Sequence, residues 1–224
     1  MARFAAPVLI GIFGLAVLLA LGVWQVRRLD WKEGVLAEIE ARIAAAPVPV
    51  PARPDPEADR YLPVTATGEI TGEEVHVLVS TRDVGAAFRI LSLFVTDDGR
   101  RLILDRGIVP DEAKDAPRPP VRATISGNLL WPDEVDAFTP DADLAGNLWF
   151  ARDAEALARE FGAEPFLIVL RETSETDPPV TPLPVDTGSI PNDHLEYAVT
   201  WFGLAAVWAG MTGFWIVRIA RGRG

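Results

Sequence analysis

The sequence predicts two transmembrane α-helices that flank an extracytoplasmic α+β domain with a mainly antiparallel sheet, which can curl into a barrel-like form. Two uncharged apolar stretches, residues 5–24 and 197–217, predict the helices. Each is long enough to cross a hydrocarbon core of about 30 Å at about 1.5 Å per residue. Between them, short segments rich in Val, Ile, Leu and Phe alternate with turn residues and lack helical crossovers, which predicts antiparallel strands.

A cleaved signal peptide is the alternative interpretation of residues 5–24, because Arg3 gives them a short positive start. However, the apolar stretch exceeds the roughly 7–15 residues of a signal core. The stretch ends at Trp24, and Gln25 and two arginines follow it in place of the small residues of a cleavage site. The sequence therefore favours a retained first span at 5–24, with Trp24 at the membrane interface.

The charges beside the two spans predict their orientation. The basic tail at 218–224 carries three arginines and no acidic residue, which predicts a cytoplasmic C-terminus and, with two spans, a cytoplasmic N-terminus at residues 1–4. Arg27, Arg28 and Lys32 favour the opposite orientation, but the loop is far longer than the roughly 60 residues over which charge counting applies. No Arg- and Ser-rich transit peptide is visible, so we expect a bacterial inner membrane with the loop domain in the periplasm.

Prolines divide the region between the spans. Residues 25–59 are expected to form a juxtamembrane helix, with apolar residues at three- and four-residue steps, followed by a proline-rich linker. The folded periplasmic domain is expected at 60–172. A second proline-rich linker at 173–194 leads to the second span at 195–217.

Within the domain, hydrophobic segments and turn residues predict six strands and one helix. The helix covers 153–161, with Asp153 as its N-cap and Gly162 near its end. A hairpin loop is expected at 97–99, where the sequence is Asp-Asp-Gly. The expected strands lie at 61–70, 75–80, 88–96, 101–105, 121–130 and 166–171.

Composition excludes several classes of function. The chain has no cysteine, hence no disulfide, thiolate metal site or cysteine nucleophile, and its net charge of −11 makes nucleic acid an unsuitable partner. No nucleotide-binding, serine-hydrolase or zinc-protease motif is present. His76 lacks neighbouring ligand residues and is expected to be structural. The segment 105–110 is interpreted as a turn with a local surface ion pair rather than as a catalytic Asp and Arg.

His194 lies where the second proline-rich segment meets the second span. Trp201 and Trp208 follow at seven-residue steps and continue its stripe, whereas a small-residue face at 203, 206, 210 and 213 is expected to pack on the glycines of the first span. One interpretation is that His194 caps or hydrates the helix start and the tryptophans fill space against lipid. The other is that its imidazole ligates haem iron beside the aromatic surface, while Arg27 and Arg28 pair with the propionates.

Motifs in five segments follow one another along the chain. They are GVWQVRRLDWK at 22–32; YLPV at 61–64 with Gly68; DRG at 105–107 with VP at 109–110; NLWF at 147–150 with RD at 152–153; and PN at 191–192, HL at 194–195, YA at 197–198 and TWFGLA at 200–205. With these motifs the chain resembles the surfeit locus protein 1 family of cytochrome c oxidase assembly factors, as a bacterial member. It departs from the family pattern at Ile108, Asp193 and Glu196, where Trp, Asn and Gln are usual.

The resemblance implies a membrane chaperone, not an enzyme, that transiently binds haem a and assists its insertion into the catalytic subunit of a haem-copper oxidase. It implies that His194 binds the haem iron, and haem a synthase is a further expected partner. Asp193 and Glu196 add negative charge beside that site. The alternative function is an interaction scaffold that stabilises the nascent oxidase subunit without carrying haem. A two-span sensor is disfavoured because only seven residues follow Val217.

Overall fold

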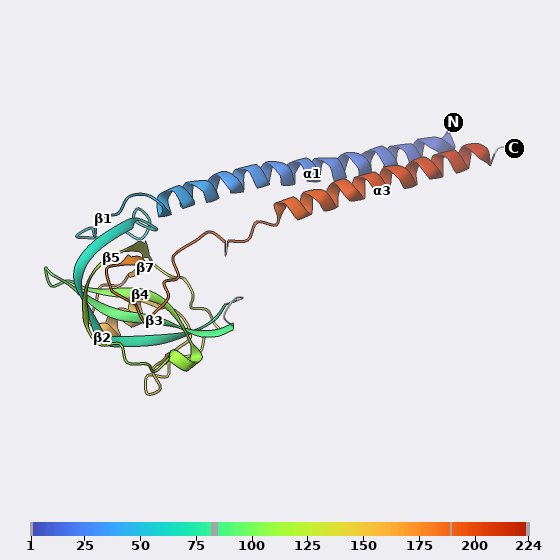
Figure 1. Cartoon of the computed structure of the whole chain (residues 1–224). Helices are drawn as coiled ribbons and strands as arrows, with labels where there is room; N and C mark the ends of the chain where they lie inside the picture. Colours follow the sequence, from blue (N-terminus) through green and yellow to red (C-terminus); the bar gives the residue numbers. More distant parts are fainter. Residues whose placement is uncertain (1, 82–84, 189, 223–224) are drawn as a thin grey trace. The chain divides into compact units, whose positions relative to one another are not determined.

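The computed structural model describes residues 2–81, 85–188 and 190–222, and their contacts divide the chain into two compact units. One unit joins Met1–Glu38 with Thr187–Gly224 and contains the two long helices, and the other is Ile39–Asp186, which contains the sheet (Figure 1). Arg223, one of the three tail arginines, lies outside the described residues.

Two long helices form the first unit. Helix α1 covers Ala2–Ile43 and helix α3 covers His194–Arg221. Both are long and apolar enough to span a membrane, which confirms the predicted pair of helices and supports a two-span membrane protein. The first span and the juxtamembrane helix are one continuous helix, which ends shortly before Pro47 because the proline-rich sequence cannot continue it.

Among the residues that the structure describes, the second unit contains seven strands, helix α2, a 3₁₀ turn and the last turn of α1. The strands are β1 (Val48–Pro49), β2 (Pro63–Thr81), β3 (Gly85–Thr96), β4 (Arg101–Pro110), β5 (Val121–Leu130), β6 (Leu148–Trp149) and β7 (Leu167–Thr173). The 3₁₀ turn η1 is Asp111–Ala113, and helix α2 is Ala154–Phe161. Asp153 caps α2 by accepting a hydrogen bond from the Ala156 amide at 3.0 Å, and Gly162 ends it in the left-handed region, both as predicted.

Five strands close into a mixed barrel. Their order is β2, β3, β4, β7 and β5, and β5 pairs again with β2. All neighbours are antiparallel except β4 and β7, which run parallel. The predicted barrel-like, mainly antiparallel sheet is thus confirmed. Closure depends on β2, whose first half pairs with β5 and whose residues from Gly68 onward pair with β3. The two strands predicted at 61–70 and 75–80 therefore form one long strand. Its pairing with β3 has a register shift between Ile70 and Glu74.

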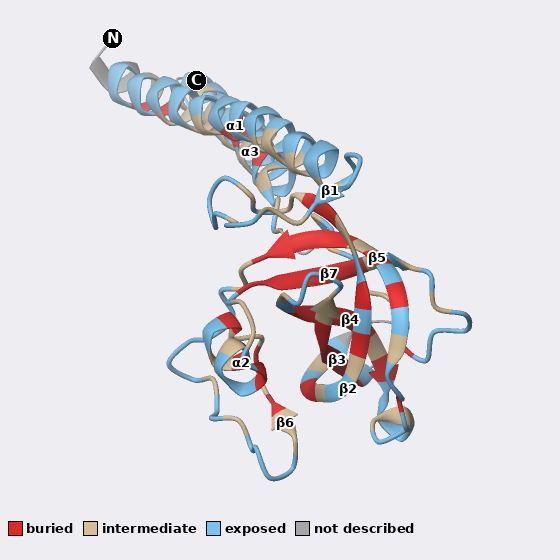
Figure 2. Cartoon of the chain, turned by 90° about the vertical axis from the view of Figure 1, so that its left-hand side faces the viewer, coloured by how far each residue is buried: buried red, intermediate tan, exposed pale blue. Residues whose placement is uncertain are grey.

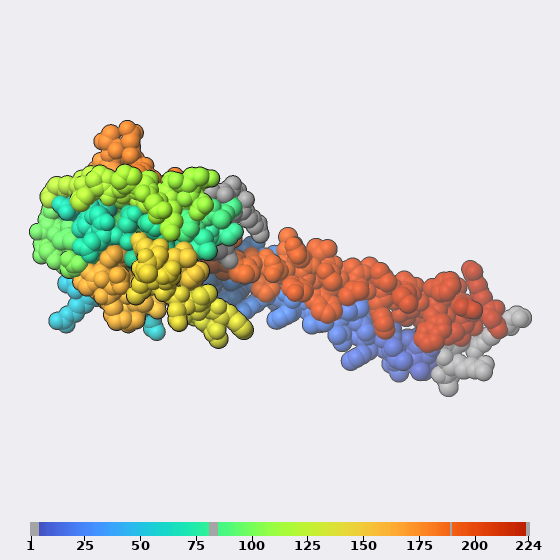
Figure 3. All heavy atoms as spheres, turned by 90° about the horizontal axis from the view of Figure 1, so that it is seen from below, coloured from blue at the N-terminus to red at the C-terminus, as the bar shows by residue number. Residues whose placement is uncertain are grey.

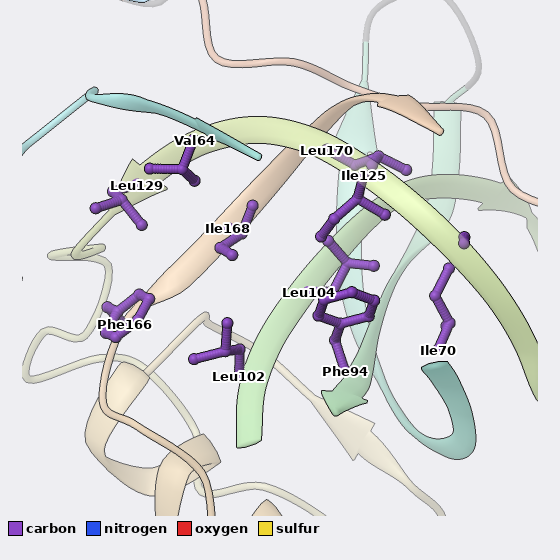
Figure 4. Packing of buried hydrophobic residues seen from close by; sticks show 11 residues of the cluster. Val64, Ile70, Phe94, Leu102, Leu104, Ile125, Leu129, Phe166, Ile168 and Leu170 are labelled. Atoms are coloured by element: carbon purple, nitrogen blue, oxygen red, sulfur yellow. The ribbon is translucent and has the colours of Figure 1, made fainter. Parts of the chain in front are cut away.

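Two hydrophobic clusters cover the two faces of this sheet. The first draws side chains from all five barrel strands and fills the interior; Figure 4 shows Leu104, Phe94 and Ile168 among its members. The second cluster lies on the outer face, where residues of β3 and its neighbouring strands pack against α2 and β6. Helix α2 and strand β6 lie beside each other in Figure 2. Because both faces are covered, β3 has eight consecutive buried residues. Each large apolar side chain buried in this way contributes roughly 1.5–3 kcal/mol.

The last turn of α1 belongs to the barrel unit and is held by it. The Ile43 carbonyl accepts hydrogen bonds from Asn128 Nδ2 at 3.1 Å and from Arg171 Nη1 at 2.9 Å. Arg42 donates to the Ala58 carbonyl nearby. The final carbonyls of a helix lack partners within the helix, and here side chains of β5 and β7 satisfy one of them.

The segment 105–110 is not the turn with a surface ion pair that the sequence suggested. It continues β4, and both Asp105 and Arg106 are buried, at 0% and 2% exposure. Their charges do not pair with each other: Asp105 binds two arginines from other segments, and Arg106 binds Glu175 at 2.8 Å. The prediction was wrong because adjacent residues in this strand direct their side chains to different partners, which only the fold supplies.

Candidate functional site

His194 is the first residue of α3, and its imidazole binds a buried side chain of α1. His194 Nδ1 lies 2.8 Å from Gln25 Oε1. Gln25 is only 7% exposed, whereas His194 is partly exposed. The second ring nitrogen, Nε2, makes no hydrogen bond to any residue that the structure describes. A single imidazole nitrogen of this kind fits an axial position on haem iron.

The two helices of this unit pack antiparallel. Contacts join Gly22 to Phe202, Gly14 to Trp208 and Gly11 to Thr212, so the position on α3 rises as the position on α1 falls. Trp208 Nε1 also donates to the Gly11 carbonyl at 3.0 Å. The helices lie against each other along their length in Figure 3, where α1 is blue and α3 is red.

The packing face of α3 is the opposite of the one predicted. The small residues at 203, 210 and 213 face open space, since a Cβ added at any of these glycines would meet no atom within 4 Å. The histidine and tryptophan stripe packs on α1 instead, and Ala198 and Ala205 are buried between its larger members. Large side chains of α3 fit into the hollows that the glycines leave on α1, which gives close van der Waals packing.

This packing separates the two predicted tryptophans. Trp208 is fixed between Gly11 and Gly14, and its ring atoms lie 2.5 Å from the position of a Cβ at Gly14. It follows His194 by two heptads, a rise of about 21 Å along the helix. Trp201 is one heptad from His194, a rise of about 10 Å, and it remains partly exposed. Both tryptophans are partly exposed, and of the two Trp201 lies nearer to His194 along α3.

Arg27 and Arg28 both follow Gln25 on α1, and both are exposed. At about 100° per residue, Arg28 points about 60° from Gln25 around the helix, and Arg27 about 160°. The Arg28 guanidinium carbon stands 3.9 Å from the centroid of the Trp31 ring, in a cation–π contact. Arg28 therefore lies on the side of α1 that faces His194, and Arg27 lies on the far side.

Gln25 is the site residue that sequence reasoning missed. The sequence did contain a signal for this residue. Positions 11, 18 and 25 are spaced by seven residues and lie on the face of α1 that packs on α3. An amide at the end of such an apolar stripe needs a partner when buried. The identity of this partner could not be predicted from the sequence, because His194 lies 169 residues further along the chain.

The barrel carries a second group of buried polar side chains. Glu74 Oε1 accepts from His76 Nε2 at 2.9 Å and from Arg118 at 2.8 Å. Burial opposes ionisation of Glu74, but the hydrogen bonds from His76 and Arg118 outweigh it and lower the pKa of this carboxyl. His76 is 5% exposed and belongs to this network, and no group of three or more potential metal ligands occurs among the described residues. These contacts stabilise the barrel.

A family model and several curated proteins are similar in sequence to this chain. A sequence model described as the SURF1 family matches residues 12–206, a range that includes Gln25, the barrel and His194. Surfeit locus protein 1 of Homo sapiens is 30% identical over 226 residues, covering 90% of this chain and 74% of the human protein. The Xenopus tropicalis protein of the same name is 31% identical, covering 84% of this chain and 68% of its own length.

The similarity extends to bacteria. A SURF1-like protein of Rickettsia bellii is 26% identical over 206 residues, which cover 85% of this chain and 82% of that protein. Since the family model spans most of the chain and a relative at 30% identity covers nine tenths of it, the chain belongs to the SURF1 family, and this membership supports a role as an assembly factor in cytochrome c oxidase assembly.

Proposed function

We propose that this chain carries haem a during cytochrome c oxidase assembly and that His194 Nε2 is the axial ligand of the haem iron. The observation that supports the proposal is the orientation of the imidazole: Nδ1 is held by Gln25 at 2.8 Å, while Nε2 binds no described residue. His194 also begins a membrane-length helix, where a ring nitrogen can meet an amphipathic macrocycle at the bilayer surface.

One ligand from the protein suits transient binding. Haem whose iron is held by two strong axial ligands is released slowly. A carrier must instead bind haem less tightly than its recipient does, so that the haem passes on. The recipient in this proposal is the catalytic subunit of a haem-copper oxidase, and haem a synthase is the donor. In this proposal Trp201 would flank the macrocycle and Arg28 would pair with a propionate, whereas Arg27 lies on the far side of α1.

The proposed orientation places both termini in the cytoplasm and the barrel in the periplasm of a bacterial inner membrane. It follows from the arginines after the second span. Because the chain contains no cysteine, a single introduced thiol reports sidedness. We expect a membrane-impermeant maleimide to label Asp98→Cys in spheroplasts and to label Arg221→Cys only after lysis; the reverse pattern would refute the orientation.

Haem occupancy of the purified full chain tests the ligand assignment. The protein is purified from cells that make haem a, together with His194→Ala and His194→Asn. The Asn variant keeps an amide donor that can reach Gln25 but offers no suitable ligand for iron. We expect both variants to lose the haem absorption spectrum while retaining wild-type helical content. Occupancy equal to that of the wild type in either variant would exclude His194 as the ligand.

A scaffold function is the second candidate, and a surface of the barrel unit favours it. Phe138 is 90% exposed, Leu144 63% and Val135 53%. Leu144 and Val135 line a cavity of about 510 Å³ beside α2, and exposed apolar side chains around a hollow are typical of protein-binding surfaces. Co-purification of the oxidase subunit that persists in a haem-free background and is lost in Phe138→Ser would support this function over haem transport.

A further inference from the structure

Gln25 determines which nitrogen of His194 is free. The side-chain oxygen of glutamine only accepts hydrogen bonds, so the imidazole nitrogen 2.8 Å from it must carry the proton. In a neutral imidazole the other nitrogen then bears the lone pair. The contact with Gln25 Oε1 therefore selects the tautomer with hydrogen on Nδ1 and the lone pair on Nε2.

We propose that Gln25 is a positioning residue: it holds His194 in the Nδ1–H tautomer and fixes the ring so that Nε2 is the ligand atom. This inference rests on the proposed function, and it extends it to a residue of the first span. Histidines that bind metals usually donate their other N–H to an oxygen, which sets both tautomer and ring orientation. The pairing of Gln25 with His194 has this form.

The surroundings of Gln25 make it a fixed acceptor. Gly22, one turn earlier on α1, receives the Phe202 ring, whose nearest atom is 2.6 Å from the position of a Cβ at Gly22. Ala198, one turn after His194, is 3% exposed. These close contacts on both helices hold the backbones near the hydrogen bond, so the amide of the buried Gln25 has little freedom to turn away.

An amide acceptor also suits a carrier better than a carboxylate. A carboxylate in this position would strengthen the donation from Nδ1, raise the basicity of Nε2 and tighten metal binding. It would also bury a negative charge in an apolar helix pair, which is unfavourable unless the charge is compensated. A neutral amide orients the ring without either effect, so the ligand is positioned but remains weak enough to release its cargo.

Nitrogen NMR of the full chain in detergent micelles measures the tautomer without any haem. Because His76 and His194 are the only histidines, [¹⁵N]histidine labelling gives two imidazoles, and His194→Ala assigns them. We expect wild-type His194 to be the Nδ1–H tautomer, Gln25→Glu to preserve it, and the near-isosteric Gln25→Met to lose it. An Nε2–H tautomer in the wild type, or an unchanged tautomer in Gln25→Met, would overturn the inference.

Titration with ferric haem links the tautomer to ligand binding. We expect Gln25→Met to bind roughly 10–100-fold more weakly than the wild type, the range typical for loss of such a partner, and Gln25→Glu to bind at least as tightly as the wild type. Circular dichroism confirms that the helices of each variant form. If His194→Ala loses haem but Gln25→Met does not, the positioning role is wrong and the proposed function stands. If His194→Ala binds haem like the wild type, the proposed function itself fails, whatever tautomer is found.

Discussion

Arg152 Nη1 donates a hydrogen bond to Asp105 Oδ2 at 2.9 Å. This bond joins two motif segments through residues that are 47 positions apart in the chain. Asp105 is fully buried, and Arg89 Nη1 binds the same oxygen at 2.7 Å. Asp105 Oδ1 in turn accepts from the Gly107 amide at 3.2 Å. The motifs at 105–107 and 147–153, on which the family resemblance partly rested, therefore meet at one buried carboxylate that stabilises the barrel unit.

Replacing Asp105 with Asn should strongly destabilise this unit. The substitution leaves Arg89 and Arg152 with a neutral partner, and breaking a buried ion pair costs about 3–5 kcal/mol. Guanidinium unfolding of the full chain in detergent, followed by circular dichroism, measures the loss. The control is Asp97→Asn, whose pair with Arg122 is exposed and contributes at most about 1 kcal/mol. Equal effects of the two substitutions would contradict the prediction.

Gly107→Ala should destabilise the fold more than Gly99→Ala. Both glycines have positive φ angles, at +118° and +85°, so alanine is strained at either position by about 1–2 kcal/mol. At Gly107 a Cβ would also collide with the Thr181 carbonyl, and Ile108 and Thr181 exchange two backbone hydrogen bonds there. At Gly99 the space is open. The same unfolding measurement ranks the two variants, and similar losses would show that residue 181 moves away at little cost.

Stability of the barrel unit should fall as the pH is lowered below the ordinary carboxyl range. Burial raises the pKa of Glu134, but hydrogen bonds from Arg152 outweigh this effect and lower it, as those from His76 and Arg118 do for Glu74. A carboxyl with a lowered folded pKa contributes stability that is fully present above its unfolded value of about 4.5 and is lost as the pH falls towards the folded value. Unfolding free energies between pH 7 and pH 3 test this. Glu134→Gln should have a shallower slope, and an unchanged slope would contradict the assignment.

A bulky residue at Gly14 should separate α1 from α3, whereas the same residue at Gly210 should not. A Cβ at Gly14 would stand 2.5 Å from the Trp208 ring, while one at Gly210 meets no atom within 4 Å. Leu18 lies between Gly14 and Gly22 on α1, and Ala205 lies between their partners on α3, so cysteines introduced at 18 and 205 should cross-link. We expect Gly14→Val to reduce this cross-linking several-fold and Gly210→Val to preserve it. The opposite result would restore the packing face predicted from the sequence.

Arg28→Ala should weaken haem retention more than Arg27→Ala. Arg28 lies about 60° from Gln25 around α1, and Arg27 about 160°, so only Arg28 is placed for a propionate of haem bound at His194. A charge-assisted hydrogen bond contributes about 1.5–3 kcal/mol, which corresponds to roughly a tenfold or greater loss of affinity. Titration of the two variants with ferric haem gives the comparison. Equal losses would indicate general electrostatic attraction instead of a specific pair.

The sequence predicted most elements where local patterns are strong. Asp153 and Gly162 marked the two ends of α2, and the Asp-Asp-Gly loop marked the turn between β3 and β4. Alternation and composition located the barrel strands to within a few residues, except that β2 was divided at Gly72 and β4 was ended at Asp105. At both places a glycine or a pair of charges looked like a turn in the sequence. The strands continue there because they pair with segments distant in the chain, and a local pattern does not show this pairing.

Local sequence patterns were enough to predict two apolar helices that flank a sheet domain along the chain, and a histidine at the start of the second helix. These features follow from hydrophobic length, periodicity and caps, which act between near neighbours in the chain. The folded structure was needed to show that the tryptophan stripe packs on the glycines of α1, that Asp105 binds Arg89 and Arg152, and that His194 meets Gln25. Such choices depend on the shape and partners available across the fold, since the same glycine or histidine can face either side of its helix at nearly equal local cost.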